Sequence, residues 1–197
     1  CVSNTMQAVT RADGSVVVIH CQPLLDVDSL ADNVLRSRTP DAEDPLVTTL
    51  VDRIVAVVAD GIPIDPQFAN WCWFDGDLWQ LDLSTPFIVD NGDIVYDTSG
   101  FQHEFPWLIR RTVYRELMKA AVKYVDVEYV LTDVMTQLHR MGLSAWCQPF
   151  ADAARARHGR TIDPAVAKAR CDADAKFYPF LLRSKRVERR WRRLTRR

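Results

Sequence analysis

A run of β-branched residues near the start of the chain predicts its first buried strand. Residues 15–25 (SVVVIHCQPLL) follow a turn at Asp13-Gly14. Pro23 ends the run, because proline cannot donate a hydrogen bond to a β-ladder. We expect this strand to lie in the core.

Apolar residues then recur at helical spacing. Residues 27–36 predict a short helix, and Asp26 or Asp28 can serve as its cap. Residues 45–60 predict a longer helix that begins at Pro45, because proline suits a first helical turn. The apolar face of the longer helix consists of Leu46, Leu50, Ile54 and Val57.

Two β-hairpins are predicted in the middle of the chain. The first covers residues 71–82 and turns at Asp75-Gly76. The second covers residues 87–96 and turns at Asn91-Gly92, which is the strongest short turn signal. We expect the tryptophans of the first hairpin to lie in the core or at its edge, not on a surface that stacks bases or sugars.

The rest of the chain predicts helices. Residues 106–124 begin with a proline at a natural first-turn position, and residues 127–141 end at Gly142. Further helical segments cover residues 144–158 and 163–182. The expected fold class is therefore α+β and mainly helical.

Length and composition fit one soluble globular domain. The chain has 197 residues, of which 48% are hydrophobic and 26% are charged, so it can bury a single core. Its apolar runs are too short to cross a bilayer. Five cysteines without a C-x-x-C pair predict reduced thiols in a cytoplasm, with neither disulfides nor a zinc site. Because the chain begins at Cys1, we expect it to be a piece of a longer protein.

The net charge of −1 hides a strong asymmetry. Residues 183–197 carry nine Lys or Arg and one Glu, so their charge is +8 and that of residues 1–182 is −9. Val187, Trp191 and Leu194 follow helical spacing among the arginines, which predicts a basic amphipathic helix. We therefore divide the chain into a body, residues 1–182, and a tail, Arg183–Arg197. An anionic membrane surface or a nucleic acid suits this tail, and so does a solvated end folded back on the acidic body.

The candidate chemistry lies in residues 65–82, DPQFANWCWFDGDLWQLD. Asp65 opens a loop, Asn70 closes it, and Asp82 ends the hairpin that follows. One carboxylate that accepts a proton, with an amide and a second carboxylate that hold a metal, suits a nucleotide and its magnesium. Each residue also has a structural alternative: a turn residue, a loop-closing hydrogen bond and a strand-end cap.

In this order of elements, residues 15–82 resemble the hinge and catalytic region of the protein-kinase-like superfamily, especially its aminoglycoside-phosphotransferase branch. In that family a strand leads into a hinge, helices follow, and a catalytic loop H-x-D-x4-N precedes a hairpin with a metal-binding Asp. The segments DPQFANW and LDLSTP also resemble an uncharacterised bacterial family thought to share this fold. The resemblance covers roughly the first half of the chain.

The resemblance implies a role for each candidate residue. Asp65 would accept the proton of an attacking hydroxyl group on a small molecule. Asn70 and Asp82 would hold Mg²⁺ on the phosphates of ATP. The backbone expected to meet the adenine edge is that of Cys21, Gln22 and Pro23.

The sequence also departs from the family. Pro63 stands where the family has its loop-bracing His, and Leu83-Ser84 replace Phe-Gly after the metal-binding Asp. No glycine-rich loop and no strand-borne Lys precede Ser15. We therefore expect the hinge and large lobe of an ATP- and Mg²⁺-dependent phosphotransferase, inactive without its small lobe. The alternative is a non-catalytic, pseudokinase-like interaction module that uses its basic tail.

Overall fold

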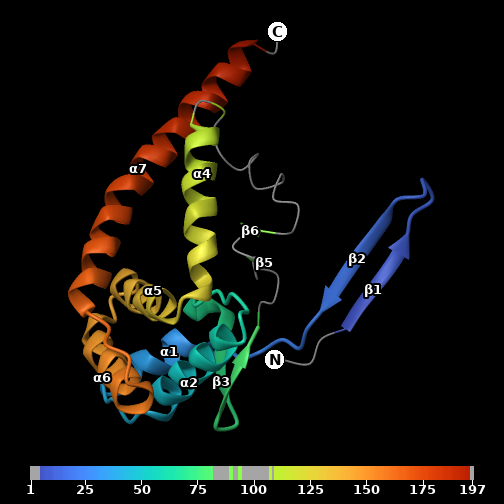
Figure 1. Cartoon of the computed structure of the whole chain (residues 1–197). Coiled ribbons are helices and arrows are strands. Elements are labelled where there is room, and N and C mark those ends of the chain that lie inside the picture. The colour runs from blue at the N-terminus through green and yellow to red at the C-terminus, as the bar shows by residue number, and fades with distance from the viewer. Residues whose placement is uncertain (1–4, 82–88, 91–92, 95–106, 108, 196–197) are drawn as a thin grey trace.

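The computed structural model describes residues 5–81, 89–90, 93–94, 107 and 109–195 (Figure 1). They form a mainly helical α+β fold with small antiparallel hairpins, which confirms the expected class. The strands are β1 (Thr5–Thr10), β2 (Val16–Cys21), β3 (Trp71–Phe74), β4 (Asp77–Gln80), β5 (Val89–Asp90) and β6 (Asp93–Ile94). The α-helices are α1 (Ala31–Arg36), α2 (Pro45–Ala59), α4 (Arg110–Ala121), α5 (Val127–Arg140), α6 (Cys147–His158) and α7 (Pro164–Thr195). Short 3-10 helices are η1 (Val27–Ser29), η2 (Phe68–Asn70), η3 (Val122–Val125) and η4 (Ser144–Trp146).

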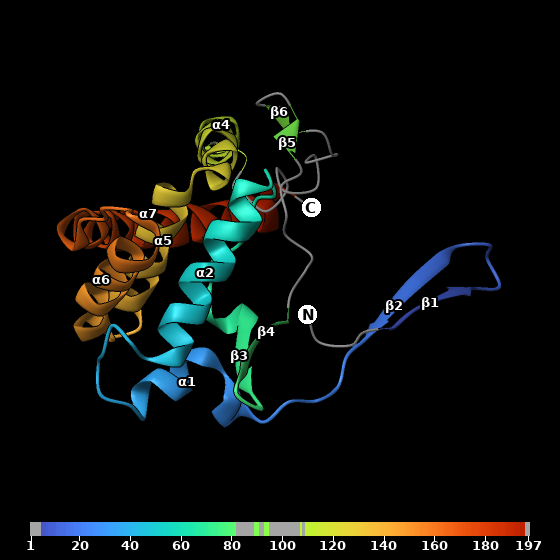
Figure 2. The ribbon, with the colours of Figure 1, turned by 60° about the horizontal axis from the view of Figure 1, so that its bottom comes forward.

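Helix α2 forms the centre of the core and confirms the predicted long helix. It begins with Pro45, and the Asp44 side chain caps it by accepting a hydrogen bond from the Leu46 backbone N–H at 2.8 Å. Gly61 follows its end with a φ of +75°. The helix lies beside α5 and α6 (Figure 2). Its fully or nearly fully buried residues are Leu46, Val47, Leu50, Val51, Ile54 and Val58.

The hairpin β3–β4 forms at the predicted turn. Asp75 and Gly76 have φ angles of +53° and +75°. Positive φ at both central residues is what a two-residue type I′ turn requires, and aspartate followed by glycine tolerates it best. Trp71 on β3 is buried against the core, and Trp73 is half-buried under the Arg38 guanidinium. This places Trp71 and Trp73 as predicted.

Only part of the second predicted hairpin falls within the described residues. Val89 pairs with Ile94 and Asp90 pairs with Asp93 in antiparallel register. This pairing leaves two residues between the strands, in agreement with the predicted turn. The turn residues 91–92 themselves lie outside the described residues.

The strand β2 was predicted to be buried, and this prediction is wrong. Val16 and Val18 are 61% and 63% exposed. The strand pairs with β1, which the sequence did not predict, through the turn at Asp13-Gly14. This two-stranded hairpin extends away from the helices (Figures 1 and 2). A β-branched run predicts a strand well, but burial depends on what packs against it.

The helices of the second half follow the predicted spacing. Helix α5 begins where the Asp126 side chain accepts a hydrogen bond from the Glu128 backbone N–H at 2.8 Å, and it ends before Gly142, whose φ is +72°. Helix α7 continues across residue 183, so the body and the tail share one helix. None of the helices among the described residues is both long and apolar enough to cross a membrane. The cysteines of the described ranges carry free thiols.

Candidate functional site

The structure brings Asp65 and Asn70 together. The Asn70 side-chain N–H donates a hydrogen bond to the Asp65 carboxylate, with 3.1 Å between Nδ2 and Oδ2. The backbone N–H of Gln67 donates to the other oxygen of Asp65 at 3.0 Å, and the Gln67 side chain donates to Oδ2 at 3.2 Å. An aspartate that accepts from the backbone two residues on stabilises a tight loop. The carboxylate is therefore held in one orientation by donors from its own loop.

Apolar packing anchors this loop. Ile64 and Phe68, on either side of Asp65, are 3% and 1% exposed. The Phe68 ring meets the Phe150 ring edge-on, with 6.1 Å between the ring centroids. Pro63, two residues before Asp65, is also buried. Buried apolar side chains therefore hold Asp65, itself half-buried, at the edge of the core.

The hairpin closes directly on Asn70. The Asn70 carbonyl accepts a hydrogen bond from the Leu81 backbone N–H at 2.8 Å. This bond extends the register in which Trp71 pairs with Gln80. The chain therefore leaves the hairpin beside the residue that contacts Asp65. The predicted metal ligand Asp82 comes next in the sequence and lies outside the described residues.

The predicted hinge contacts the same end of the hairpin. The Gln22 side-chain N–H donates to the Leu81 carbonyl, with 2.5 Å between Nε2 and O. This contact joins segments 59 residues apart in the sequence. The segment of Cys21, Gln22 and Pro23 therefore lies beside the residue that precedes Asp82.

One described side-chain oxygen of this loop is of the kind that binds magnesium. The hydrogen bond to Asp65 uses the amide nitrogen of Asn70, so Oδ1 is the Asn70 atom suited to a cation. Carboxylate and amide oxygens are hard ligands of the kind Mg²⁺ prefers. Within the described residues, no three His, Cys, Asp or Glu side chains gather into a metal site. A metal here would thus depend on Asn70 and Asp82.

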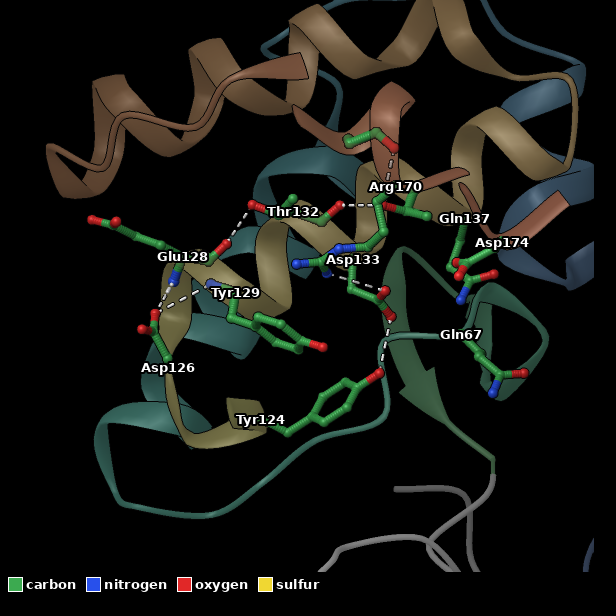
Figure 3. Close-up of polar contacts among 12 residues, drawn as sticks. Gln67, Tyr124, Asp126, Glu128, Tyr129, Thr132, Asp133, Gln137, Arg170 and Asp174 are labelled. Atoms are coloured by element: carbon green, nitrogen blue, oxygen red, sulfur yellow. Dashed lines mark hydrogen bonds and ion pairs between the residues drawn. The ribbon is translucent and has the colours of Figure 1, made fainter. Parts of the chain in front are cut away.

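A buried polar cluster, which the sequence did not predict, lies between α5 and α7 (Figure 3). Its centre is Asp133 on α5, which is only 7% exposed. The Tyr124 hydroxyl donates to Asp133 Oδ2 at 3.3 Å, and Arg170 Nη1 lies 3.6 Å from Oδ1. The Tyr129 ring lies 4.3 Å from the Arg170 guanidinium carbon. The sequence signal is an aspartate within the apolar face of an amphipathic helix.

The cluster shifts the pKa values of its members. Burial raises the pKa of Asp133, and the charges of Arg170 and Arg140 oppose that rise. Burial also raises the pKa of Tyr124, with smaller contributions from the charges of Asp133 and, further down, Asp65.

A second ionic group joins α2 to α6. Asp52 accepts hydrogen bonds from Arg157, at 2.8 Å from Nε, and lies 2.7 Å from His158 Nε2. The hydrogen bond from Arg157 is the main cause that lowers the pKa of Asp52. These contacts join α2 to α6 at the surface, and none of the three side chains is a hydroxyl or thiol nucleophile of the kind that enzymes commonly use. We regard this group as structural.

Comparisons with protein-family models, with curated proteins and with solved structures found no match for this chain. The structure itself shows that the fold is α+β and mainly helical. The resemblance to the kinase-like superfamily rests only on the order of residues 15–82.

Proposed function

We propose that the chain is the hinge and large lobe of a kinase-like phosphotransferase, which moves the terminal phosphoryl group of ATP to a hydroxyl group of a small molecule. One observation carries this proposal. The Asp65–Asn70 hydrogen bond lies in a loop that leads directly into a hairpin, and the last strand of that hairpin ends against both Asn70 and Gln22.

Asp65 is the proton acceptor in this proposal. Its carboxylate is oriented by Gln67 and Asn70, and the residue is only partly buried, which leaves room for an acceptor hydroxyl in this proposal. Phosphoryl transfer needs little covalent help from the protein, so placing this base correctly is the main task. Asn70 keeps the carboxylate turned toward the hairpin end.

Asn70 and Asp82 would hold the Mg²⁺, which neutralises charge on the phosphates when bound. The backbone of Cys21, Gln22 and Pro23 would bind the adenine edge. The Gln22–Leu81 hydrogen bond supports this arrangement, because it keeps the nucleotide-binding segment beside the residue that precedes Asp82. The preference for a small-molecule acceptor comes from the resemblance to the aminoglycoside-phosphotransferase branch.

Calorimetric titration with ATP, with and without Mg²⁺, tests these roles on the full-length protein. We expect binding to require Mg²⁺ and Asp82→Ala to abolish that requirement. We expect Asp65→Ala to remove phosphate transfer while nucleotide affinity stays within about twofold. The matched control is Asp75→Asn, which alters a carboxylate at the turn of the same hairpin and leaves both readouts unchanged.

One result would refute the catalytic proposal. It is metal-free ATP binding of equal strength in the wild type and in Asp82→Ala. That result would leave the interaction module as the better description.

A further inference from the structure

The C-terminal part of α7 differs from the rest of that helix in how its charges are compensated. We call residues 183–195 the tail helix. In the first part of α7, Lys168 pairs with Asp172 at 2.8 Å. Arg170 pairs with Asp133, and Asp174 pairs with Arg140. Two basic groups in the first part of α7 are thus compensated, Lys168 by Asp172 of the same helix and Arg170 by Asp133 of α5.

Three arginines of the tail helix whose side chains the structure describes have no such partner. Arg183, Arg186 and Arg190 are exposed, and none of them has an ion pair with another described residue. Residues 183–197 as a whole carry a charge of +8. A positive charge of this density along one segment attracts an anionic partner.

The tail helix also presents apolar surface. Val187 is 58% exposed, although it is an apolar residue within an ordered helix. The sequence places Trp191 and Leu194 four and seven positions further on, which is the same helical face. A narrow apolar stripe flanked by arginines is the composition of helices that lie in a membrane interface.

The position of the helix suits that role. In Figure 1 the end of α7 lies far from α2, α5 and α6, which form the core. Residues 1–182 carry a charge of −9 and are repelled by an anionic surface. A basic helix that projects from an acidic body can contact such a surface while the body stays away from it.

We propose that the tail helix binds anionic lipid surfaces, with its arginines on the headgroups and its apolar stripe between them. A nucleic acid is the competing partner, because phosphate backbones also attract arginines. Nucleic-acid phosphates do not need an apolar stripe, whereas a lipid interface uses both features. The exposed Val187 therefore favours lipid.

Co-sedimentation of the chain with phosphatidylcholine vesicles, with and without phosphatidylglycerol, tests the proposal. We expect binding only when phosphatidylglycerol is present. The triple variant Arg183→Gln, Arg186→Gln, Arg190→Gln should bind roughly 100-fold more weakly. The matched control replaces exposed arginines of the β1–β2 turn, α4 and α6 without changing the tail: Arg11→Gln, Arg111→Gln and Arg155→Gln. It should change binding by less than about twofold.

A second pair of variants tests the apolar stripe at constant charge. Val187→Asn should weaken vesicle binding about fivefold, because a buried apolar side chain is lost from the interface. Val166→Asn changes a valine of the same helix that is 52% exposed and lies outside the tail, and it should bind as the wild type does. Circular dichroism should show equal helix content in both variants.

Two outcomes would overturn the proposal. One is equal binding, or none, to vesicles with and without phosphatidylglycerol. The other is binding of the wild type to a DNA duplex that the triple arginine variant loses, together with no effect of Val187→Asn on vesicles or duplex. The second outcome would assign the tail helix to nucleic acid.

Discussion

Two aspartates, Asp65 and Asp133, illustrate two uses of a carboxylate in this molecule. Asp65 is half-buried and accepts hydrogen bonds from residues two and five positions further along its own loop. Asp133 is 7% exposed and depends on Tyr124 and Arg170, which come from η3 and α7. A carboxylate whose hydrogen bonds come from its own loop adds little to the stability of the fold and remains available for chemistry. A carboxylate whose partners come from elements distant in the sequence holds those elements together.

The largest expected effect is the loss of Arg170. Arg170→Met leaves Asp133 buried without its cation, and a buried charge without a partner is strongly destabilising. Because the Arg170 side chain is 27% exposed, we expect a loss of about 2 kcal/mol in the free energy of unfolding, measured by urea denaturation. Arg155→Met, which removes an exposed arginine of α6, should cost less than about 0.5 kcal/mol. Equal losses in the two variants would show that Asp133 does not depend on Arg170.

A smaller effect is expected from Tyr124. Tyr124→Phe removes the hydroxyl that donates to Asp133 and keeps the ring, so we expect a loss of about 1 kcal/mol. Tyr129→Phe is the matched control, since its ring contacts Tyr124 and Arg170 in the same cluster. It should cost clearly less in the same urea titration. A larger loss in Tyr129→Phe would contradict the role given to the Tyr124 hydroxyl.

The pH dependence of stability should separate Asp133 from Asp52. Burial raises the native pKa of Asp133 above 3.8, so the native state holds this proton more tightly than the unfolded chain does. Its contribution to stability therefore falls as the pH rises from 3.8 through the native pKa. The stability of Asp133→Asn relative to the wild type should rise over that same window.

Asp52 should show the opposite sign. The Arg157 hydrogen bond lowers its native pKa below 3.8, so its contribution is complete above 3.8 and is lost as the pH falls through the native pKa. The deficit of Asp52→Asn relative to the wild type should shrink only below pH 3.8. Urea titrations across the acidic pH range measure the free energy of unfolding of both variants relative to the wild type. If this difference changed with pH in the same direction in both, the opposite pKa shifts given to Asp133 and Asp52 would be contradicted.

The smallest effect on stability is expected at Asp65. Asp65→Asn keeps one acceptor oxygen for the Gln67 backbone N–H, and the loop is anchored by Ile64 and Phe68, so the loss should be about 0.5 kcal/mol. A loss as large as that of Arg170→Met would mean that Asp65 is structural. The same urea titration provides the comparison.

Local signals in the sequence predicted much of this fold. A proline at the first turn of α2, the Asp75-Gly76 pair between β3 and β4, and Gly142 after α5 each set a boundary that the structure confirms. The burial of β2 was predicted wrongly, because its apolar residues give no information about what packs on them. The chain becomes strongly basic from residue 183 on, but α7 continues through that point, so this change of charge does not mark the end of a helix.

The candidate site was predictable to the extent that it is local. The Asp65–Asn70 contact follows from a spacing of five residues within one loop. The Asp133–Arg170 contact joins α5 to α7 across more than thirty residues, and no local spacing announces it. Apolar support by Pro63 and Ile64 was missed for a related reason: proline and isoleucine before an aspartate also occur in exposed turns.

The central proposal is that Asn70 and Asp82 hold one cation beside Asp65, and paramagnetic broadening by Mn²⁺ tests it most directly. In the ¹⁵N-labelled protein with ATP, Mn²⁺ should broaden the amide signals of Asn70 and Leu81, and Asp82→Ala should restore them. Gly14 lies in the turn between β1 and β2, and that hairpin extends away from the helices (Figure 1), so its signal should not change. Unchanged signals at Asn70 and Leu81, or broadening that persists in Asp82→Ala, would contradict the proposal.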